Sequence, residues 1–338
     1  MPIFLRPFAN TPAATASPYL VTVAQALLWH GIAPTTRKSY LTGRRSYERF
    51  CVTHGFGADH WPASSDAVCV WLAFLFHHKR LAFATIKHYL AGVSSSHTDI
   101  GVASIIPSDD RISRVLRGIK SLRGAKSATP PKLPITFAII RRIAEHVDLQ
   151  SRDHCMLLAA MWVGTAALLR TGEFAVANPR NPDPHRLLLR SDLTLANGHW
   201  FIHLRASKTD PFREGVSVPI LALEATTALQ RYLSTLPTDY SGPLFAFASG
   251  VPLGRDDIVA FSSRAVSCAG VAWTNPEGTQ CKGVSFRKGG ASSLASVNTP
   301  DRVIQIVGRW KSGVYRQYIH ESAHDLASYF SKLEPNST

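Results

Sequence analysis

The sequence predicts a mostly helical protein with one small antiparallel β-sheet in its second half. Apolar residues recur at helical spacing through the first 123 residues, and three short stretches of strand-like pattern occur much later. Between these regions, residues 124–136 contain three prolines and small polar residues, a composition typical of an extended linker. A chain of 338 residues can form two domains with ordinary cores. We therefore expect a helical domain at 1–123, a linker at 124–136 and a mixed domain at 137–338.

The first domain is expected to consist of five helices. Four of them begin close to Ser or Thr residues that can cap a helix, and the fifth starts at 107–110, where Ser108 is followed by two aspartates that suit the helix dipole. The first four are expected near 18–30, 36–54, 65–79 and 83–96.

The fifth helix is expected to bury one face and expose the other. Its apolar stripe at helical spacing consists of Ile112, Val115, Leu116, Ile119 and Leu122. The opposite side carries Arg114, Arg117 and Lys120, which would meet solvent or phosphate. By contrast, the segment 68–76 is apolar all round, which predicts a central buried helix whose aromatic side chains belong to the core.

The helix at 36–54 is strongly basic. It carries Arg37, Lys38, Arg44, Arg45 and Arg49 around three aromatic residues. Two interpretations are open: a solvated charged face, or a surface that contacts phosphates. Nothing in this half of the sequence indicates a particular base sequence.

Net charge narrows the class of partner. The formal charge is +14, and residues 1–130 account for +9 of it, with 15 basic and 6 acidic side chains. Such a field attracts polyanions, so nucleic acid or an anionic membrane surface is favoured over a charge that serves only solubility. We expect a soluble protein of the cell interior, because no apolar run approaches the roughly 20 residues of a membrane span and the start lacks a signal-peptide core. The five cysteines contain no C-x-x-C pair, which argues against a zinc site or a disulfide framework.

The second domain is expected to mix helices with a small sheet. Helices are predicted at 136–147 and 151–168, and again from about 223 to the end. The strands are predicted at 186–195, 200–206 and 215–220.

Five residues of this domain have the chemistry needed to hold and attack a phosphodiester. In chain order they are Arg170, Lys208, Arg287, Trp310 and Tyr318. A guanidinium grips two phosphate oxygens and stays charged, a phenol can form a covalent phosphoester, and a lysine can give a proton to the leaving oxygen.

Taken singly, each local context also has a simpler explanation. Glu173 could orient Arg170 through its guanidinium or its backbone, but a structural ion pair is the more common meaning of this spacing. Lys208 is predicted at the tip between two strands, where it could enter a DNA groove or be an ordinary hairpin charge. The segment 285–290 is predicted to open a helix whose amides favour a phosphate and whose two glycines allow close backbone approach.

Together, these residues resemble the tyrosine recombinases, the family of the bacteriophage integrases, whose signature is Arg, Lys, His-x-x-Arg, His or Trp, then Tyr. The phrases around Arg287 and Trp310 look most like the Crypton class of eukaryotic mobile elements. The resemblance implies a helical core-binding domain and a catalytic domain that clamp double-stranded DNA as a dimer to tetramer. It implies DNA recombination or integration, including transposase activity, without metal or ATP.

The resemblance also implies roles for the residues. Arg170 and Arg287 would bind the scissile phosphate, Lys208 would protonate the leaving 5′-oxygen, Trp310 would pack and hydrogen-bond at the phosphate, and Tyr318 would form a 3′-phosphotyrosine. Lys288, beside Arg287, is expected to contact DNA together with the basic residues of the first domain.

Two positions complicate these assignments. Tyr315 lies three residues before Tyr318 on the same predicted helix and competes with it as nucleophile, although Tyr318 fits the family pattern better. Val284 stands where the family has the histidine of His-x-x-Arg, and an isopropyl group can neither hydrogen-bond a phosphate nor move a proton. His203 and His320 are conceivable substitutes, though each could be an ordinary histidine. Two functions therefore stay open: a recombinase, or a DNA-binding module that has lost turnover.

The end of the chain predicts a contact between subunits. An apolar stripe at helical spacing consists of Ala323, Leu326, Ala327, Phe330 and Leu333. This helix could dock on its own domain, and the resemblance suggests docking on a neighbouring subunit. The location implied is the nucleus in a eukaryotic host and otherwise the cytoplasm.

Overall fold

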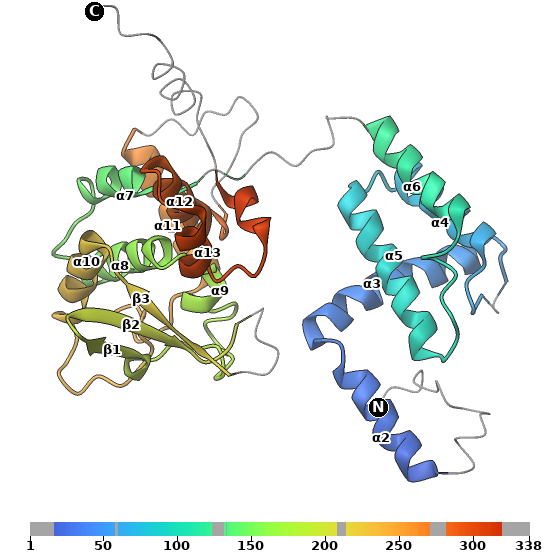
Figure 1. The fold of residues 1–338 in the computed structure, drawn as a ribbon, viewed down its shortest axis with the longest axis horizontal. Coiled ribbons are helices and arrows are strands. Elements are labelled where there is room, and N and C mark those ends of the chain that lie inside the picture. The colour runs from blue at the N-terminus through green and yellow to red at the C-terminus, as the bar shows by residue number, and fades with distance from the viewer. Residues whose placement is uncertain are drawn as a thin grey trace, which may run out of the picture. The chain divides into compact units, whose positions relative to one another are not determined.

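The computed structural model describes residues 17–57, 60–123, 132, 134–207, 214–270 and 282–319. They belong to two compact units, Met1–Thr129 and Pro130–Thr338, each with its own hydrophobic core (Figure 1). As predicted, the fold is mostly helical and contains one three-stranded antiparallel sheet. Among the described residues, no helix has both the length and the apolar character needed to cross a bilayer.

The first unit consists of helices. These are α2 (Pro18–His30), α3 (Pro34–Thr53), α4 (Ser65–His77), α5 (Phe83–Asp99) and α6 (Asp110–Arg123). Each lies within a few residues of its predicted range. Side-chain caps account for two of the starts. Ser64 accepts the N–H of Ala67 at α4, and the Asp109 carboxylate accepts two N–H groups at α6. The helices α2 and α3 instead have proline in their first turn, while α5 follows Ala82 with no side-chain cap.

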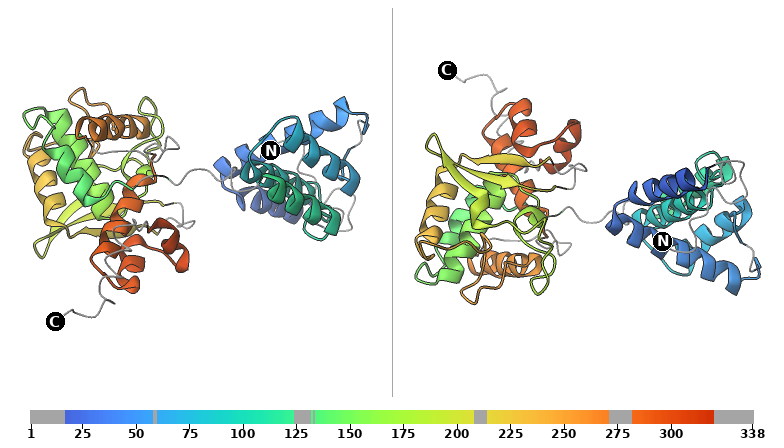
Figure 2. Two further views of the ribbon diagram at one scale, coloured as in Figure 1. Left: turned by 90° about the horizontal axis from the view of Figure 1, so that it is seen from above. Right: turned by 90° about the horizontal axis from the view of Figure 1, so that it is seen from below.

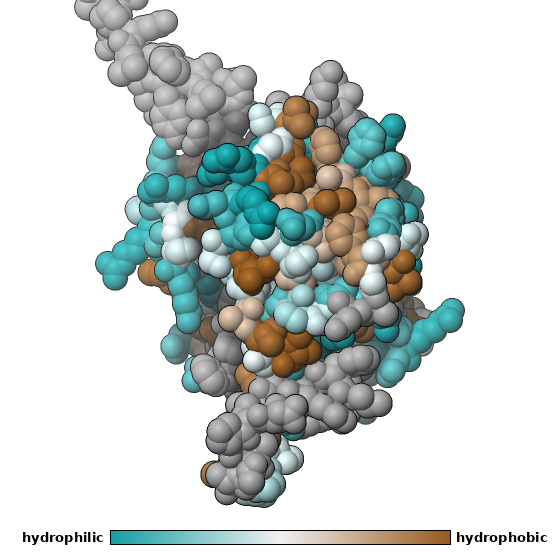
Figure 3. Space-filling model, turned by 90° about the vertical axis from the view of Figure 1, so that its right-hand side faces the viewer, coloured by the Kyte–Doolittle hydropathy of each residue, from teal (hydrophilic) through white to brown (hydrophobic). Residues whose placement is uncertain are grey.

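The core of the first unit differs from the prediction in two places. Ile112 and Ile119 are buried as the stripe on α6 predicts, but Leu122, in the last turn of the helix, is 78% exposed. Trp71 is fully buried on α4, yet Val70 beside it is half exposed, so this helix has a solvent face and is not buried all round. On the face of the molecule shown in Figure 3, hydrophobic side chains lie in separate patches between hydrophilic ones.

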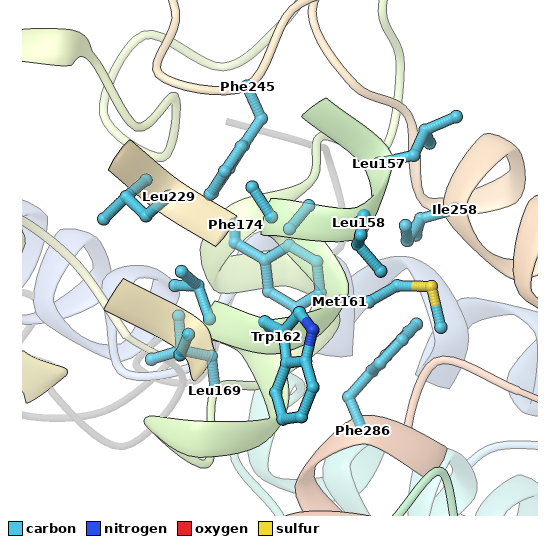
Figure 4. Close-up of a cluster of buried hydrophobic side chains, with 14 of the residues drawn as sticks. Leu157, Leu158, Met161, Trp162, Leu169, Phe174, Leu229, Phe245, Ile258 and Phe286 are labelled. Carbon is cyan, nitrogen blue, oxygen red and sulfur yellow. The ribbon is translucent and has the colours of Figure 1, made fainter. Parts of the chain in front are cut away.

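The second unit begins with three helices, and the second of them is buried. The helices α7 (Phe137–Ala144) and α8 (Arg152–Ala166) are followed by the short helix α9 (Thr171–Phe174). Every residue of α8 from Cys155 to Thr165 is buried, and Figure 4 shows Met161 and Trp162 packed among side chains from the surrounding elements. Because α8 is enclosed in this way, the turn that leaves it is held firmly.

The sheet follows, to one side of the helices of the second unit (Figures 1 and 2). Its antiparallel strands are β1 (Leu193–Ala196), β2 (His199–Leu204) and β3 (Val216–Ile220), in that order. The first predicted strand, 186–195, is wrong over most of its length. Arg190–Asp192 forms a 3₁₀ turn, η2, because the Asp192 carboxylate accepts the N–H of Leu189 and draws the backbone into a local bend.

Helices complete the second unit. These are α10 (Leu223–Leu233), α11 (Arg255–Cys268), α12 (Ser285–Ser296), α13 (Asp301–Gly308) and a 3₁₀ helix, η3 (Gly313–Tyr318). Two glycines let α12 approach its neighbours closely. A side chain at Gly289 would overlap the carbonyl of Ile135, and one at Gly290 would overlap that of Thr165. The close approach predicted here is therefore to the protein's own backbone.

Candidate functional site

Arg170 lies in the turn that joins α8 to α9, and Glu173 holds it by two contacts. Its backbone N–H donates to Glu173 Oε2 at 2.8 Å, and its Nη1 donates to Oε1 at 2.9 Å. Both contacts that the spacing allowed are thus present. Glu173 is only 6% exposed, so this carboxylate orients Arg170 from inside the fold.

Arg287 enters the same place from α12. The side chain is 1% exposed, its Nη1 donates to the carbonyl of Leu168 at 3.1 Å, and its Nη2 donates to the carbonyl of Gly308. Leu168 lies in the turn before Arg170, so the packing of α12 on α8 brings together two arginines that are 117 positions apart in the sequence.

Arg309 is a third arginine at this site, and it was not among the residues predicted from the sequence. Its Nη2 donates to Glu173 Oε2 at 2.8 Å and to the carbonyl of Leu168 at 3.3 Å. Arg309 ends α13 in a left-handed conformation with φ of 57°. Gly308 precedes it, where a side chain would overlap the ring of Trp310. The sequence Gly308-Arg309-Trp310 could have indicated that Arg309 belongs to the site, but spacing alone does not distinguish Arg309 from a surface arginine.

The charges of this cluster are only partly balanced. Burial lowers the pKa of Arg287 to about 10, and the neighbouring charges of Arg170 and Arg309 act in the same direction. Burial alone would raise the pKa of Glu173, but Arg309 and Arg170 outweigh it and the net direction is down. At neutral pH the three guanidiniums and one carboxylate therefore carry a net charge of +2. Within the described structure, the buried Nε of Arg287 and the buried Nε and Nη1 of Arg309 have no hydrogen-bond partner.

Trp310 and Tyr318 lie against these arginines. The Arg287 guanidinium carbon is 4.4 Å from the centroid of the Trp310 ring and 5.8 Å from that of Tyr318. The two rings are 5.0 Å apart, and Tyr318 is partly exposed at the end of η3. Tyr315 differs in being 1% exposed, with a hydroxyl that donates to the Asp301 carboxylate. Of the two candidate nucleophiles, Tyr315 already has a structural partner, and Tyr318 is the one beside the arginines.

Val284 precedes the first turn of α12 and is 39% exposed. The side chain adds no polar group near Arg287. His203 lies on β2, where its Nδ1 is 3.3 Å from Ser217 Oγ. Lys208 and His320, like the terminal stripe from Ala323 to Leu333, lie outside the described residues.

A small hollow lies between the β2 strand and Glu173, the carboxylate of the arginine cluster. Glu173 lines it together with His203, Arg205 and Ala206. The chain that leads toward Lys208 thus borders the carboxylate that holds Arg170 and Arg309.

The predicted DNA contacts fall into two groups. Lys288 is 9% exposed, burial lowers its pKa, and its Nζ donates to the carbonyl of Lys132 at 2.9 Å. Arg37 donates to the carbonyl of Trp29 at 2.8 Å, and Arg44 pairs with Glu48 at 2.6 Å. These three side chains have partners within the fold, and their contact with phosphate stays a prediction. The exposed group consists of Lys38, Arg45, Arg114, Arg117 and Lys120.

Comparisons with known proteins identify the fold. No family model matches the sequence, and no curated protein does. Among solved structures, a lambda integrase dimer bound to a COC′ core site is similar with a TM-score of 0.58 at 15% identity, over 90% of this chain and 95% of that one. XerH site-specific recombinase bound to palindromic difH substrate gives 0.55 at 16% identity, over 81% and 73%.

The integrase of the Tn1549 transposon, in complex with circular intermediate DNA, is also similar. Its TM-score is 0.50 at 14% identity, over 81% of this chain and 86% of that one. Mostly helical with a small antiparallel sheet, the chain has the fold of the tyrosine recombinases and integrases.

Proposed function

We propose that this protein is a DNA recombinase that cleaves and rejoins strands through a 3′-phosphotyrosyl intermediate. One observation carries the proposal. Three arginines converge beside the partly exposed phenol of Tyr318, and two of them, Arg287 and Arg309, have buried N–H groups without a partner among the described residues. Fixed cationic donors next to a nucleophile are what in-line attack on a phosphodiester requires, because charge develops on the non-bridging oxygens.

The proposed reaction begins with attack by Tyr318. Arg170 and Arg287 bind the non-bridging oxygens, and the phenolic oxygen forms a bond to phosphorus while its proton passes to water. The bond between phosphorus and the 5′-oxygen breaks, and Lys208 gives that oxygen a proton. Because the phosphotyrosine retains the energy of the diester, attack by another 5′-hydroxyl reverses the step and rejoins DNA.

Glu173 and Trp310 have supporting roles in this scheme. Glu173 fixes the guanidinium of Arg170 through two contacts. Trp310 packs its indole on Arg287 and Tyr318, which limits water at the phosphate and keeps the phenol near the cations.

Duplex DNA is the proposed partner, with assembly of two to four copies on it. The exposed lysine and arginine side chains of α3 and α6 supply phosphate contacts from the first unit. The similar lambda integrase structures include a dimer on a core site and a tetramer on a Holliday junction. The finer likeness to Cryptons rests only on the sequence around Arg287 and Trp310.

A second candidate function is supported by Val284. With an apolar side chain at this position, the protein could bind DNA through the same cluster without completing turnover. Loss of one acid or base group costs about 10² to 10⁴-fold in rate where that group matters.

A covalent adduct separates the two functions. Full-length protein is incubated with a pool of nicked duplexes whose core sequence is randomised, so that cleavage releases a short strand and traps the phosphotyrosine. We expect an adduct that survives denaturing electrophoresis, and sequencing of its DNA identifies the preferred site. Tyr318→Phe should abolish the adduct. Tyr315→Phe removes the other candidate nucleophile and should still form the adduct, although more slowly because loss of the contact with Asp301 loosens η3. DNA binding without any adduct would favour the module that has lost turnover.

A further inference from the structure

Arg309 has more hydrogen-bonding capacity than its structural contacts use. Only Nη2 is bonded, to Glu173 and to the carbonyl of Leu168. The Nε and Nη1 atoms are buried and have no acceptor among the described residues. A buried N–H without an acceptor is costly, so it commonly marks a place that a ligand or water completes.

The charge of the cluster points to the kind of ligand. Arg170 alone can neutralise Glu173, and its Nη1 is 2.9 Å from that carboxylate. Arg309 adds a second cation to the same carboxylate, at 2.8 Å, and Arg287 lies beside both without an acidic partner of its own in the described part of the chain. Like charges in a desolvated site repel one another, so the net charge of +2 on these four side chains is unfavourable in the absence of an anion. A purely structural link between α9 and α13 would not require this excess of positive charge. An anion with its own oxygens would satisfy both the charge and the free N–H groups.

We infer that Arg309 is a third cation of the anion site and contacts the phosphate in the reaction proposed above. This inference rests on the proposed function for the identity of the anion, a phosphodiester of DNA. The side chain of Arg309 is held in position from two sides, by Glu173 and by the left-handed backbone at the end of α13. In this protein Arg309 supplies a fixed charge in a site that has no imidazole at position 284.

The first experiment tests the anion site without activity. Sulfate is titrated against full-length protein at constant ionic strength with chloride as the balancing ion, and the melting temperature is followed. Sulfate should bind the wild type, and Arg309→Gln should weaken its apparent affinity about ten- to a hundredfold, the range for a lost charge-assisted hydrogen bond. Arg302→Gln is the matched control, since it removes the same charge from an exposed position of α13 and should leave sulfate binding unchanged.

Folding of the variant is checked separately. Arg309→Lys keeps the charge and can keep the pair with Glu173, so it serves if Arg309→Gln does not fold, and it should weaken sulfate binding because lysine lacks the planar fork. Unchanged sulfate affinity in a folded Arg309 variant would overturn the inference.

The second experiment places the contact at the phosphate. Adduct formation is compared on a normal nicked duplex and on one with a methylphosphonate at the cleaved position, which lacks an anionic oxygen. Arg309→Gln should slow the first about ten- to a hundredfold and change the second little. Equal slowing on both substrates would mean that Arg309 acts only by positioning, and would contradict the inference. If the wild type forms no adduct, the proposed function fails, and the sulfate comparison alone decides whether Arg309 belongs to an anion site.

Discussion

At the residue scale, Val284 is an apolar residue at a position of the site where the resemblance to the tyrosine recombinases calls for a histidine. The side chain stands three residues before the buried Arg287, at the start of α12, and 39% of it is exposed. An isopropyl group there neither accepts nor donates a hydrogen bond, so position 284 contributes nothing to proton transfer. Space for a larger side chain is nonetheless available toward solvent.

Restoring an imidazole tests this interpretation. Val284→His should raise the initial rate of adduct formation by about 10²-fold or more, because a general acid or base would then be near the phosphate. The free energy of unfolding should change by about 0.5 kcal/mol or less, as for other exposed substitutions. Val297→His, the same change at the exposed far end of α12, is the control and should leave the rate unaltered. If Val284→His gave no gain in rate, the absence of an imidazole at position 284 would not be what limits the reaction.

At the element scale, a contact between α13 and η3 determines where Tyr318 lies. The buried hydroxyl of Tyr315 donates to Asp301 in the first turn of α13. Arg316 then donates from Nε to the Tyr315 hydroxyl at 3.2 Å. Because the hydrogen bonds of a 3₁₀ helix have poorer geometry than those of an α-helix, these side chains help to hold η3 in place.

Removing that hydroxyl should loosen η3. Tyr315→Phe is expected to lower the free energy of unfolding by about 0.5 to 1.5 kcal/mol, the range for an ordinary hydrogen bond, because the Asp301 carboxylate is 62% exposed. Urea denaturation of the full-length protein, followed by circular dichroism, measures the change in the transition of the second unit. Tyr318→Phe leaves the contact with Asp301 intact and should be much less destabilising. Equal losses in the two variants would show that the Asp301 contact does not stabilise η3.

At the scale of the whole molecule, the basic charge of the first unit predicts how the proposed DNA binding responds to salt. Residues 1–130 carry a net charge of +9, and α6 exposes Arg114, Arg117 and Lys120 along its polar face. Phosphate contacts release counterions, so each contact adds to the slope of log affinity against log salt concentration.

Changing all three of these residues to Gln should therefore weaken binding to every duplex alike and lower that slope by about 3, roughly one for each contact. Fluorescence anisotropy at several salt concentrations measures it. A triple variant with the same loss of charge at exposed positions of the second unit, Arg180, Arg231 and Arg264, is the control. An equal fall in slope for the control would mean that general charge, and not the α6 face, accounts for binding.

Prediction from sequence was most successful for the helices. Apolar periodicity and turn residues indicate helix boundaries because they depend on neighbours three or four positions away. The first strand was misplaced because a side chain, that of Asp192, bends the backbone where apolar residues suggested extension. Leu122 was expected to be buried because periodicity does not show where a core ends.

The residue types of the site could be read from the sequence, but their positions in space could not. The order Arg170, Arg287, Trp310, Tyr318 predicts phosphodiester chemistry, and that chemistry stays a prediction. Which arginines meet depends on α12 packing against α8 and on the end of α13 reaching Leu168, contacts between residues more than a hundred positions apart.

The sequence by itself thus determined the fold class, the basic first unit and the residue types of the site. Tertiary structure alone decided that Arg309 joins the cluster, that Lys288 is buried on a backbone carbonyl, and that Tyr315 is occupied by Asp301 while Tyr318 is not. The physical reason is that helix formation is encoded by nearby residues, whereas burial and charge pairing are set by the packing of elements distant in the chain.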